Sequence, residues 1–528
     1  MKIRITQLGV PLDYTDETIL EGSANRIGVE LEAVTAFTIV RRAIDARRLK
    51  GRVRFILMVD VEVADDAAEA RCDGEVVTDD APETPGQPER IEFAHRPVVV
   101  GAGPAGLLAA WRLANAGAKP ILIERGQPVE TRRASVGQFW ADGVLDPESN
   151  ALYGEGGAGL FSDGKLTTRS KQRGYLRAVL ELLVECGGPE EILIDAEPHV
   201  GSDKLAQIVQ TLRERIIELG GEVRFSTRLE SLEFDSGKLT GVVAGGERIA
   251  TGHCILATGH SARDVYHMLH ASGVSLAAKA FAVGVRIEFP QAQIDRSQFG
   301  PDAGHERLGP ASFRLTRREE DDARACYTFC MCPGGRVIAC SSTAGELTTN
   351  GMSLSNRDGT YGNAGFLVPI RPEDFGGDTD PLAGIALQQA IEAKAFEAGG
   401  SNYSVPASRL RDFLAGTPSR GLPADRSCQR SVPADLYEIL PDVVIDTLLH
   451  AIPRMLSQLS GVRRGEGVVY AAETRSSSPV RILRDDDFQS PGAAGLYPAG
   501  EGAGYAGGIV TSAIDGLRAA DALLASMK

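Results

Sequence analysis

The segment Gly101-Ala102-Gly103-Pro104-Ala105-Gly106 constrains the fold of this chain more than any other stretch. It follows the apolar run 97–100 and leads into the apolar segment 107–113, which has the composition of a helix start. Glycines at this spacing let the backbone turn tightly and approach a pyrophosphate, which is stabilised at the positive N-terminus of the helix. The order strand, glycine turn, helix therefore predicts a dinucleotide-binding α/β unit that begins near residue 96.

A second apolar run, 120–123, ends in Glu124. A carboxylate at the end of the second strand can accept hydrogen bonds from the ribose hydroxyls of an adenosine. Its negative charge also disfavours a 2′-phosphate by repulsion. The alternative, a glycine turn in an ordinary α/β sheet, does not explain this acid.

Length and charge narrow the class of protein. A chain of 528 residues suggests two to four domains. The formal net charge of −15 argues against general affinity for nucleic acid. The start of the chain lacks a signal-type apolar segment, and no run approaches the roughly 18 apolar residues of a membrane span. Eight cysteines in this length are not a disulfide framework, so we expect a cytoplasmic protein.

Composition shifts along the chain predict its domains. We expect a small α/β domain over 1–63, an acidic, proline-bearing linker over 64–95, a nucleotide-binding domain over 96–274, a substrate or cap domain over 275–470, and a return to the nucleotide-binding domain over 471–528. The first domain carries a basic cluster. Its members are Arg41, Arg42, Arg47, Arg48, Lys50, Arg52 and Arg54. We favour a solvated strand face paired with acids, and the alternative is a site for phosphate or RNA.

Two further glycine-rich segments belong with the first turn. The tail around Gly500-Glu501-Gly502 again reads as strand, turn and helix. The segment 154–159 also satisfies the glycine spacing, but no strand precedes it. A loop whose backbone approaches a flat ring is the better interpretation of that segment.

Together, the turn 101–106, Glu124, the strand end Ala257-Thr258-Gly259 and the turn 500–502 resemble the FAD-binding module of glutathione-reductase-like flavoproteins. They resemble in particular the single-nucleotide branch that includes aromatic hydroxylases, amine oxidases and fumarate reductases. In those families the last glycine turn lies beside the ribityl chain and the flavin ring, and its helix N-terminus would stabilise an anionic reduced flavin. The usual acid in that turn is Asp, whereas this chain has Glu501, whose extra methylene changes its reach.

Segments 330–335, 359–365 and 473–481 look like those of a family of uncharacterised bacterial FAD-dependent dehydrogenases. The resemblance implies an α/β fold: a Rossmann-like FAD-binding domain of glutathione-reductase type, an inserted mixed-sheet substrate or cap domain, and a small N-terminal α/β domain. It implies FAD as the cofactor and names no substrate.

The resemblance also implies which residues bind the cofactor. Arg125 and Arg133 would contact the adenosine or pyrophosphate, Leu229 the adenine through its backbone, and the loop 156–159 the isoalloxazine. The full predicted set is Gly101, Gly103, Pro104, Ala105, Gly106, Glu124, Arg125, Arg133, Gly156, Gly157, Gly159, Leu229, Thr258, Gly259, Gly500, Glu501, Gly507, Gly508 and Ile509.

Several side chains outside these turns are candidates for chemistry. Arg475 and Arg481 bind either a substrate carboxylate or a structural partner. Tyr361 and Tyr505 either hydrogen-bond the substrate or flavin, or pack. His260 is a weaker candidate acid or base, and the sequence identifies no catalytic residue or metal site.

The cysteines near the middle of the chain allow two interpretations. Cys330 and Cys332 lie near Cys326 and Cys340, but their spacing is not that of a thioredoxin-like motif and no second pair suits a metal. We favour buried packing cysteines, and the alternative is a redox role.

The leading functional prediction is a FAD-dependent oxidoreductase that transfers a hydride between an organic substrate and flavin N5. No second strand–turn–helix unit is present for NAD(P)H, which would act as a transient reductant. The alternatives are a flavin monooxygenase, and an RNA- or partner-binding flavoprotein that uses the basic N-terminal domain. The expected partner is a small molecule. The sequence sets no oligomeric state.

Overall fold

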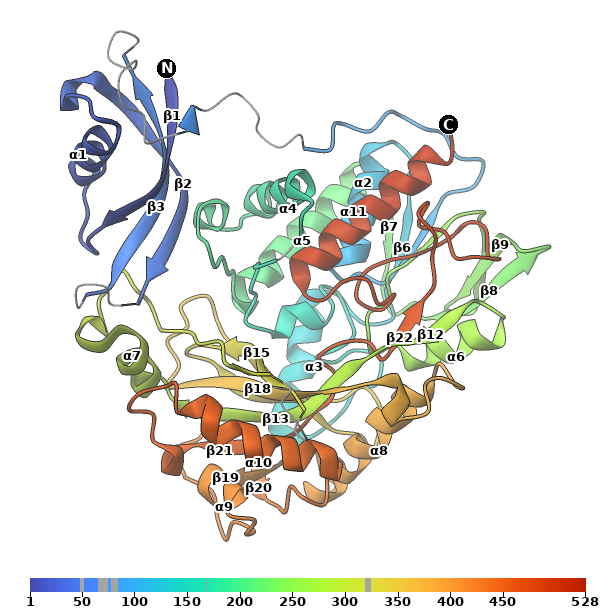
Figure 1. Cartoon of the computed structure of the whole chain (residues 1–528). Coiled ribbons are helices and arrows are strands. Elements are labelled where there is room, and N and C mark those ends of the chain that lie inside the picture. Colours follow the sequence, from blue (N-terminus) through green and yellow to red (C-terminus); the bar gives the residue numbers. More distant parts are fainter. Residues whose placement is uncertain (48–51, 65–74, 77–83, 169, 319–323) are drawn as a thin grey trace.

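The structure is a computed structural model that describes residues 1–47, 52–64, 75–76, 84–168, 170–318 and 324–528. Three parts are visible in Figure 1: an N-terminal unit, a nucleotide unit built on a parallel sheet, and a second unit built on a larger mixed sheet. Arg48, Lys50 and most of the predicted acidic linker lie outside the described residues.

The N-terminal unit is a four-stranded sheet with one helix. Its elements are β1 (Lys2–Val10), α1 (Asp16–Ile27), β2 (Val34–Asp45), β3 (Arg54–Val63) and β4 (Glu75–Val76), in the sheet order β2-β3-β1-β4. Thr15 caps the start of α1, because its hydroxyl accepts a hydrogen bond from the Thr18 amide. Alternate residues of β1 and β3, such as Ile5 and Leu57, are buried between sheet and helix.

The N-terminal unit is attached to the rest of the chain by backbone hydrogen bonds. The Arg42 amide donates to the Ile194 carbonyl, and the Ala196 amide donates to the Arg42 carbonyl, both at 2.8 Å. The Asp302 carboxylate accepts from the Val53 amide at 2.8 Å. The edge strand β2 is therefore partly covered by the nucleotide unit, which leaves fewer unpaired backbone groups.

The nucleotide unit has a five-stranded parallel sheet of order β23-β11-β5-β6-β7. The strands are β5 (Val98–Val100), β6 (Ile121–Ile123), β7 (Glu222–Arg224), β11 (Cys254–Leu256) and β23 (Leu496–Pro498). The helices are α2 (Pro104–Asn115), α3 (Val129–Asp142), α4 (Arg173–Glu185), α5 (Ser202–Glu218), α6 (Arg263–Ala271) and α11 (Ile509–Ala525). An antiparallel sheet of β8 (Leu229–Asp235), β9 (Lys238–Ala244) and β10 (Glu247–Ala250) completes the unit.

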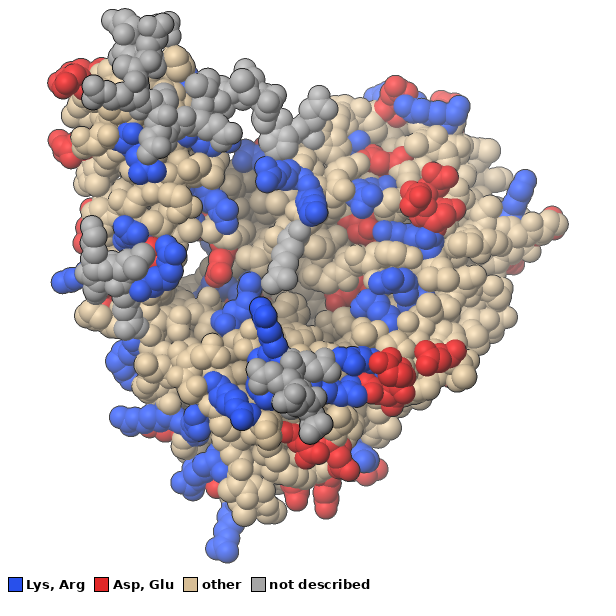
Figure 2. Space-filling model, in the orientation of Figure 1, with Lys and Arg blue, Asp and Glu red and all other residues tan. Residues whose placement is uncertain are grey.

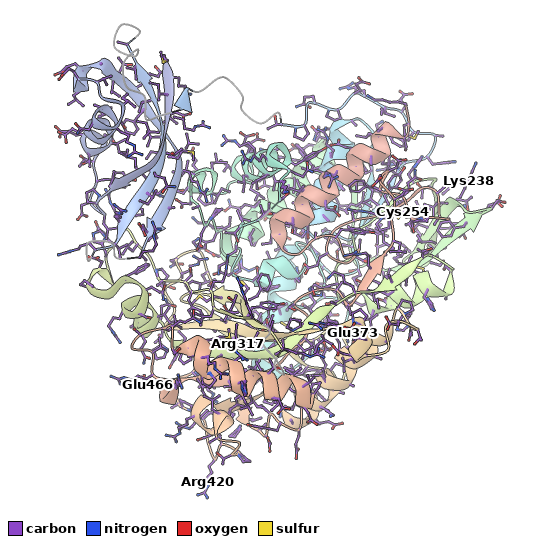
Figure 3. The ribbon with its side chains drawn as sticks, viewed as in Figure 1. Lys238, Cys254, Arg317, Glu373, Arg420 and Glu466 are labelled. Atoms are coloured by element: carbon purple, nitrogen blue, oxygen red, sulfur yellow. The ribbon has the colours of Figure 1, made fainter. Side chains whose placement is uncertain are left out.

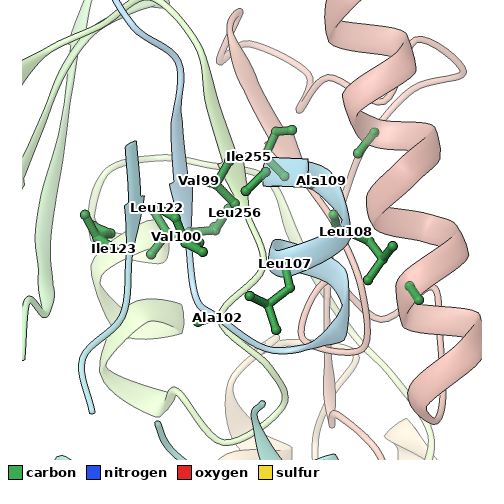
Figure 4. Close-up of a cluster of buried hydrophobic side chains, with 14 of the residues drawn as sticks. Val99, Val100, Ala102, Leu107, Leu108, Ala109, Leu122, Ile123, Ile255 and Leu256 are labelled. Atoms are coloured by element: carbon green, nitrogen blue, oxygen red, sulfur yellow. The ribbon is translucent and has the colours of Figure 1, made fainter. Parts of the chain in front are cut away.

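The core of this unit packs the first helix against the parallel sheet. Figure 4 shows Val99, Leu107 and Ile255 in one cluster of buried side chains. Helix α11 lies directly against α2, since a Cβ on Gly516 would lie 2.0 Å from the Ala105 carbonyl oxygen. The last helix of the chain is thus held beside the first glycine turn (Figure 1).

The second unit is a seven-stranded mixed sheet of order β14-β15-β18-β13-β21-β19-β20. The strands are β13 (Phe281–Pro290), β14 (Thr316–Arg317), β15 (Cys326–Cys332), β18 (Tyr361–Ile370), β19 (Val405–Arg409), β20 (Ser431–Pro433) and β21 (Val468–Glu473). The helices are α7 (Gln291–Phe299), α8 (Ala383–Ala398), α9 (Leu410–Leu414) and α10 (Asp442–Leu456). Two ribbons flank it, β16 (Arg336–Cys340) with β17 (Thr348–Met352), and β12 (Leu276–Ala278) with β22 (Val480–Ile482).

The central strands of this mixed sheet are covered on both faces. Nine of the ten residues of β13 are buried, including the charged residues Arg286 and Glu288. In the described part of the chain, no helix is long and apolar enough to cross a membrane.

Candidate functional site

A cavity of about 520 Å³ lies between the two large units. One side is formed at the carboxyl ends of the parallel strands β5, β6, β11 and β23, which is where open α/β sheets bind ligands. The other side is formed by residues of β15, β17 and the segment 473–476. Around this region, Figure 2 shows Lys and Arg side chains between the N-terminal unit and the rest of the molecule.

Sixteen of the predicted cofactor residues line this cavity, from segments about 400 positions apart in the sequence. They are Gly101, Gly103, Pro104, Ala105, Glu124, Arg125, Gly157, Gly159, Leu229, Thr258, Gly259, Gly500, Glu501, Gly507, Gly508 and Ile509. The two glycine turns touch: a Cβ on Gly500 would lie 2.8 Å from the Ala105 Cβ. The first and last glycine turns thus form one surface.

Gly106 and Gly156 support this surface without lining it. A Cβ on Gly106 would lie 1.7 Å from the Gly101 carbonyl oxygen, so this glycine allows α2 to pack closely on the turn. The Gly156 amide donates to the Ala102 carbonyl at 2.8 Å and joins the glycine-rich loop to the same turn. Gly156 has φ +84°, a backbone conformation that favours glycine.

The structure corrects the assignment of Arg133, which is exposed on α3 and does not line the cavity. Its neighbour Arg132 is fully buried and donates to the carbonyls of Asn150, Gly154 and Glu155. Arg132 therefore holds the glycine-rich loop in place. The sequence signal that identifies Arg132 as buried is helical periodicity, because Arg132 shares the buried face of α3 with Val129, Val136 and Phe139.

Glu124 is buried and holds three backbone segments together. Its carboxylate accepts from the amides of Ala102 at 2.8 Å, Gly126 at 2.9 Å and Gly154 at 3.0 Å. These bonds join the first glycine turn to the glycine-rich loop. A structural role of this kind was not part of the sequence prediction, which assigned Glu124 to the ribose alone.

Arg125 is engaged by acids as well as facing the cavity. It donates to Glu148 at 2.9 Å and to Asp264 at 3.0 Å, and its guanidinium lies 4.1 Å from the centre of the Tyr153 ring. This stacking and the two carboxylates raise the pKa of Arg125 and fix its planar group at the rim.

The shape and polarity of the cavity fit a dinucleotide cofactor. Within the described residues, no side chain caps the start of α2 or of α11, whereas α1 is capped by Thr15. Both helix starts therefore present backbone amides to the cavity, as an anionic group requires. Cβ atoms added at Gly259, Gly507 and Gly508 would meet no atom within 4 Å, so these turns face open space.

Glu501 departs from the usual Asp of its turn and lines the cavity. Burial raises the pKa of this carboxyl to about 7, against the opposing influence of the Lys279 ammonium. The Gly508 amide donates to this carboxyl at 3.5 Å, which is a weak contact. The carboxyl thus has capacity to bind another group in the cavity.

Of the four predicted substrate residues, only Arg475 lines the cavity. Arg475 donates to Glu392 at 2.6 and 2.9 Å and to the Ser342 hydroxyl at 2.7 Å. Glu392 is fully buried and also accepts twice from Arg263, both at 3.0 Å. The structural ion-pair interpretation therefore describes Arg475, and sequence reasoning missed its partners, which lie more than 80 residues away.

The other three substrate candidates lie outside the cavity lining. Arg481 is exposed and lies over the Tyr505 ring at 5.2 Å. The Tyr505 hydroxyl accepts from the Arg484 amide at 3.1 Å. Tyr361 donates to the Asp425 carbonyl at the start of β18. These contacts agree with the structural alternative for Arg481, Tyr361 and Tyr505, and the structure does not bring the three side chains to the cavity.

His260 lines the cavity, but its surroundings oppose a positive charge. Burial and the nearby guanidinium groups of Arg475 and Arg263 lower its pKa to about 4. Its Nδ1 atom lies 2.9 Å from the Ser261 hydroxyl. The imidazole is therefore neutral near pH 7.

Two further kinds of site were considered from the sequence, a metal site and a basic site for phosphate or RNA. Among the residues that the structure describes, no group of three His, Cys, Asp or Glu side chains is placed to hold a metal ion. In the basic N-terminal cluster, Arg42 pairs with Asp195, Arg47 and Arg54 pair with Asp45, and Arg52 pairs with Asp302. These pairs favour the solvated, ion-paired strand face over an RNA site.

Three family models match the chain. Residues 280–476 match the model "FAD-dependent protein, C-terminal domain-like", and residues 95–288 match "Pyridine nucleotide-disulphide oxidoreductase". Residues 2–62 match a domain of unknown function, DUF8436. These matches cover the second unit, the first part of the nucleotide unit and the N-terminal unit.

Two relatives and two solved structures are similar to this chain. A Clostridium beijerinckii protein named "Uncharacterized protein" is 40% identical over 534 residues, covering 99% of each chain. Thiamine thiazole synthase of Aeropyrum pernix is 30% identical over 146 residues, which is 28% of this chain and 42% of that protein. The flavin-dependent brominase Bmp2 is 12% identical, with a TM-score of 0.38 over 83% of this chain and 80% of that chain. Glycine oxidase of Bacillus cereus is 11% identical, with a TM-score of 0.31 over 82% and 96%.

This chain and the Clostridium beijerinckii protein are 40% identical over their full lengths, so they are related as whole chains. The matching family models identify the cofactor as FAD. The fold is an α/β FAD-binding fold of oxidoreductase type, with a Rossmann-like parallel sheet and a mixed sheet. This protein uses FAD as its cofactor and belongs to the same family of FAD-dependent flavoproteins as the Clostridium beijerinckii protein.

Proposed function

We propose that this flavoprotein is a dehydrogenase or reductase that transfers a hydride between an organic substrate and N5 of FAD. The observation that carries the proposal is the shared cavity: both glycine turns form one side, and side chains of the mixed sheet form the other. This arrangement provides room for a substrate beside the cofactor, in the part of the cavity that the parallel sheet does not form.

FAD supplies the two-electron chemistry when it is bound, and the protein positions it. We propose that Glu124 and the Leu229 backbone bind the adenosine, and that the amides at the start of α2 bind the pyrophosphate. The turn 500–509, with the start of α11, would hold the ribityl chain and the ring. The loop 156–159 would lie against the ring, because its glycines permit close approach.

The cofactor residues and the architecture support a glutathione-reductase type of nucleotide unit. We propose that 96–274 and 471–528 form one FAD domain, with 275–470 as the substrate domain and 1–63 as a separate domain. One parallel sheet of nucleotide-binding type occurs among the described residues. We therefore propose that NAD(P)H, where it serves as reductant, binds transiently in the shared cavity.

The experiment is anaerobic reduction of the purified yellow protein by NADH, NADPH and a panel of alcohols, amines and hydroxy acids. A hydride mechanism predicts bleaching of the flavin absorbance by at least one donor. Deuterium at the transferred position should slow this bleaching. Bleaching without an isotope effect in the chemical step, or hydroxylated product that carries oxygen from O₂, would contradict the dehydrogenase proposal.

A further inference from the structure

We propose that the substrate of this cavity is a small organic carboxylate with a flat apolar body, and that Arg314 binds the carboxylate beside the ring of Phe329. The inference rests on the hydride transfer proposed above, because it assigns a substrate class to the same cavity. The sequence patterns single out neither residue. Three observations carry the inference: the position of the two side chains, the exposed ring of Phe329 and the unengaged charge of Arg314.

Arg314 and Phe329 are neighbours across two antiparallel strand segments at the edge of the mixed sheet. Strand β14 pairs with β15 in antiparallel register, and just beyond β14 the Thr328 amide donates to the Leu315 carbonyl at 2.9 Å. The next pair in this register is Arg314 and Phe329, and both residues line the cavity. Figure 3 labels Arg317, which marks β14 at this edge of the sheet. The fold therefore brings a guanidinium and an aromatic ring to one part of the cavity wall.

These two side chains lie where the cavity opens to solvent. Leu315 and Thr328 are buried, whereas Arg314 is exposed and Phe329 is 50% exposed. An exposed aromatic ring on a cavity wall offers a flat apolar surface, and a second ring gains from stacking on it beyond the area that becomes buried. A ligand with a flat apolar body would cover Phe329 on entering the cavity.

The charge of Arg314 is available for a ligand. Within the described part of the chain, Arg314 forms no hydrogen bond or ion pair. The other cations that line the cavity are engaged: Arg125 by Glu148 and Asp264, Arg475 by Glu392, Arg228 by Glu148, and Lys165 by the Met331 carbonyl and Asp163. A guanidinium stays protonated and offers two parallel N–H donors, which match the two oxygens of a carboxylate.

The acid at the same part of the cavity is Glu197. Its carboxylate accepts a hydrogen bond from the Ser312 hydroxyl at 3.4 Å, and both residues line the cavity. Glu197 repels an anion that Arg314 holds, and it would attract a cationic ligand. Removing each of the two charges in turn therefore tests the charge of the ligand.

The phosphates of FAD are a competing partner for Arg314. We place the pyrophosphate at the start of α2, on the parallel-sheet side of the cavity, whereas Arg314 belongs to the mixed-sheet side. The Arg314→Gln variant should therefore purify with the flavin content of the wild type. A variant that loses FAD would overturn the assignment of Arg314 to the substrate.

The test is isothermal titration of the oxidised, FAD-bound protein with benzoate, benzamide and benzamidine. These probes share one ring and a similar shape, and near neutral pH they are an anion, a neutral molecule and a cation. Benzoate should bind at least about tenfold more tightly than benzamide, as a charge-assisted pair with arginine requires. Arg314→Gln should weaken benzoate about tenfold and change benzamide less than about twofold. Phe329→Ala should weaken both.

The matched control is Arg318→Gln, which removes the same charge from an exposed arginine outside the cavity lining. It should bind benzoate as the wild type does, and Glu197→Gln should bind benzoate more tightly than the wild type. The inference would be overturned by an equal effect of Arg314→Gln and Arg318→Gln, by benzamide or benzamidine binding as tightly as benzoate, or by the absence of saturable benzoate binding.

This titration uses resting protein, so it separates the two proposals. Benzoate binding that depends on Arg314, in a protein whose flavin no donor bleaches, would contradict hydride transfer and leave the carboxylate site in place. Bleaching by a donor, together with benzoate binding that is indifferent to Arg314, would contradict the carboxylate site alone.

Discussion

Replacing Gly103 with valine is expected to weaken FAD binding strongly while the protein still folds. A Cβ at this position has only the Gly157 Cα near it, at 3.8 Å, and the backbone φ of −78° suits any residue. The added methyl groups therefore enter the cavity, where we place the pyrophosphate. Overpacking of this kind costs about 1–3 kcal/mol or more, so the affinity for FAD should fall at least about 10- to 100-fold.

The measurement is the flavin content of the purified variant, with an FAD titration of the apoprotein and circular dichroism to verify the fold. Gly137→Val is the matched control, because Gly137 is exposed on α3 and its Cβ would meet no atom within 4 Å. That control should remain yellow. A Gly103→Val protein that purifies with full flavin would show that the cofactor is bound elsewhere.

The second large effect is on stability, at the ion-pair cluster beneath the cavity. Glu392→Gln keeps the shape of the side chain but removes the charge that Arg263 and Arg475 share. These guanidinium groups then stay buried with only Glu346 as an acidic partner. Breaking a buried pair in this way costs about 3–5 kcal/mol, and we expect that loss in the free energy of unfolding.

Urea denaturation of the FAD-bound and FAD-free forms measures this loss. Glu397→Gln, an exposed position on the same helix α8, is the control and should change stability by less than about 0.5 kcal/mol. A Glu392→Gln protein as stable as this control would mean that the cluster carries no net charge interaction. The surrounding residues would then have to accommodate two buried guanidinium groups that share Glu346 as their acidic partner.

The backbone of the nucleotide unit was readable from the sequence because its signals are local. The glycines at 101, 103 and 106, the apolar strands and the acid at Glu124 each follow from a steric or electrostatic need within a few residues. The segment around Gly500 was predictable for the same reason, because it repeats the strand–turn–helix order of the first glycine turn. In the structure it lines the same cavity. Short-range constraints of this kind can be recognised in a single sequence.

The partners of the functional side chains could not be predicted from the sequence, because they depend on contacts between segments that are distant in the chain. Arg475 looked equally suited to a substrate carboxylate, and only the fold brings Glu392 to it. The sequence prediction named Arg133 and did not consider Arg132, which is the arginine on the buried face of α3. Cys330 lines the cavity from the irregular part of β15 between Thr328 and Met331, and this irregularity depends on the pairing with β18, which no local pattern reveals.

The central claim is that the cavity between the two glycine turns holds FAD, and a crystal structure of the FAD-bound protein tests it most directly. The account predicts cofactor density along one cavity, with the pyrophosphate at the start of α2 and the isoalloxazine ring beside the turn 500–509. Cofactor density outside the surface formed by Gly103, Gly157 and Gly508 would contradict it.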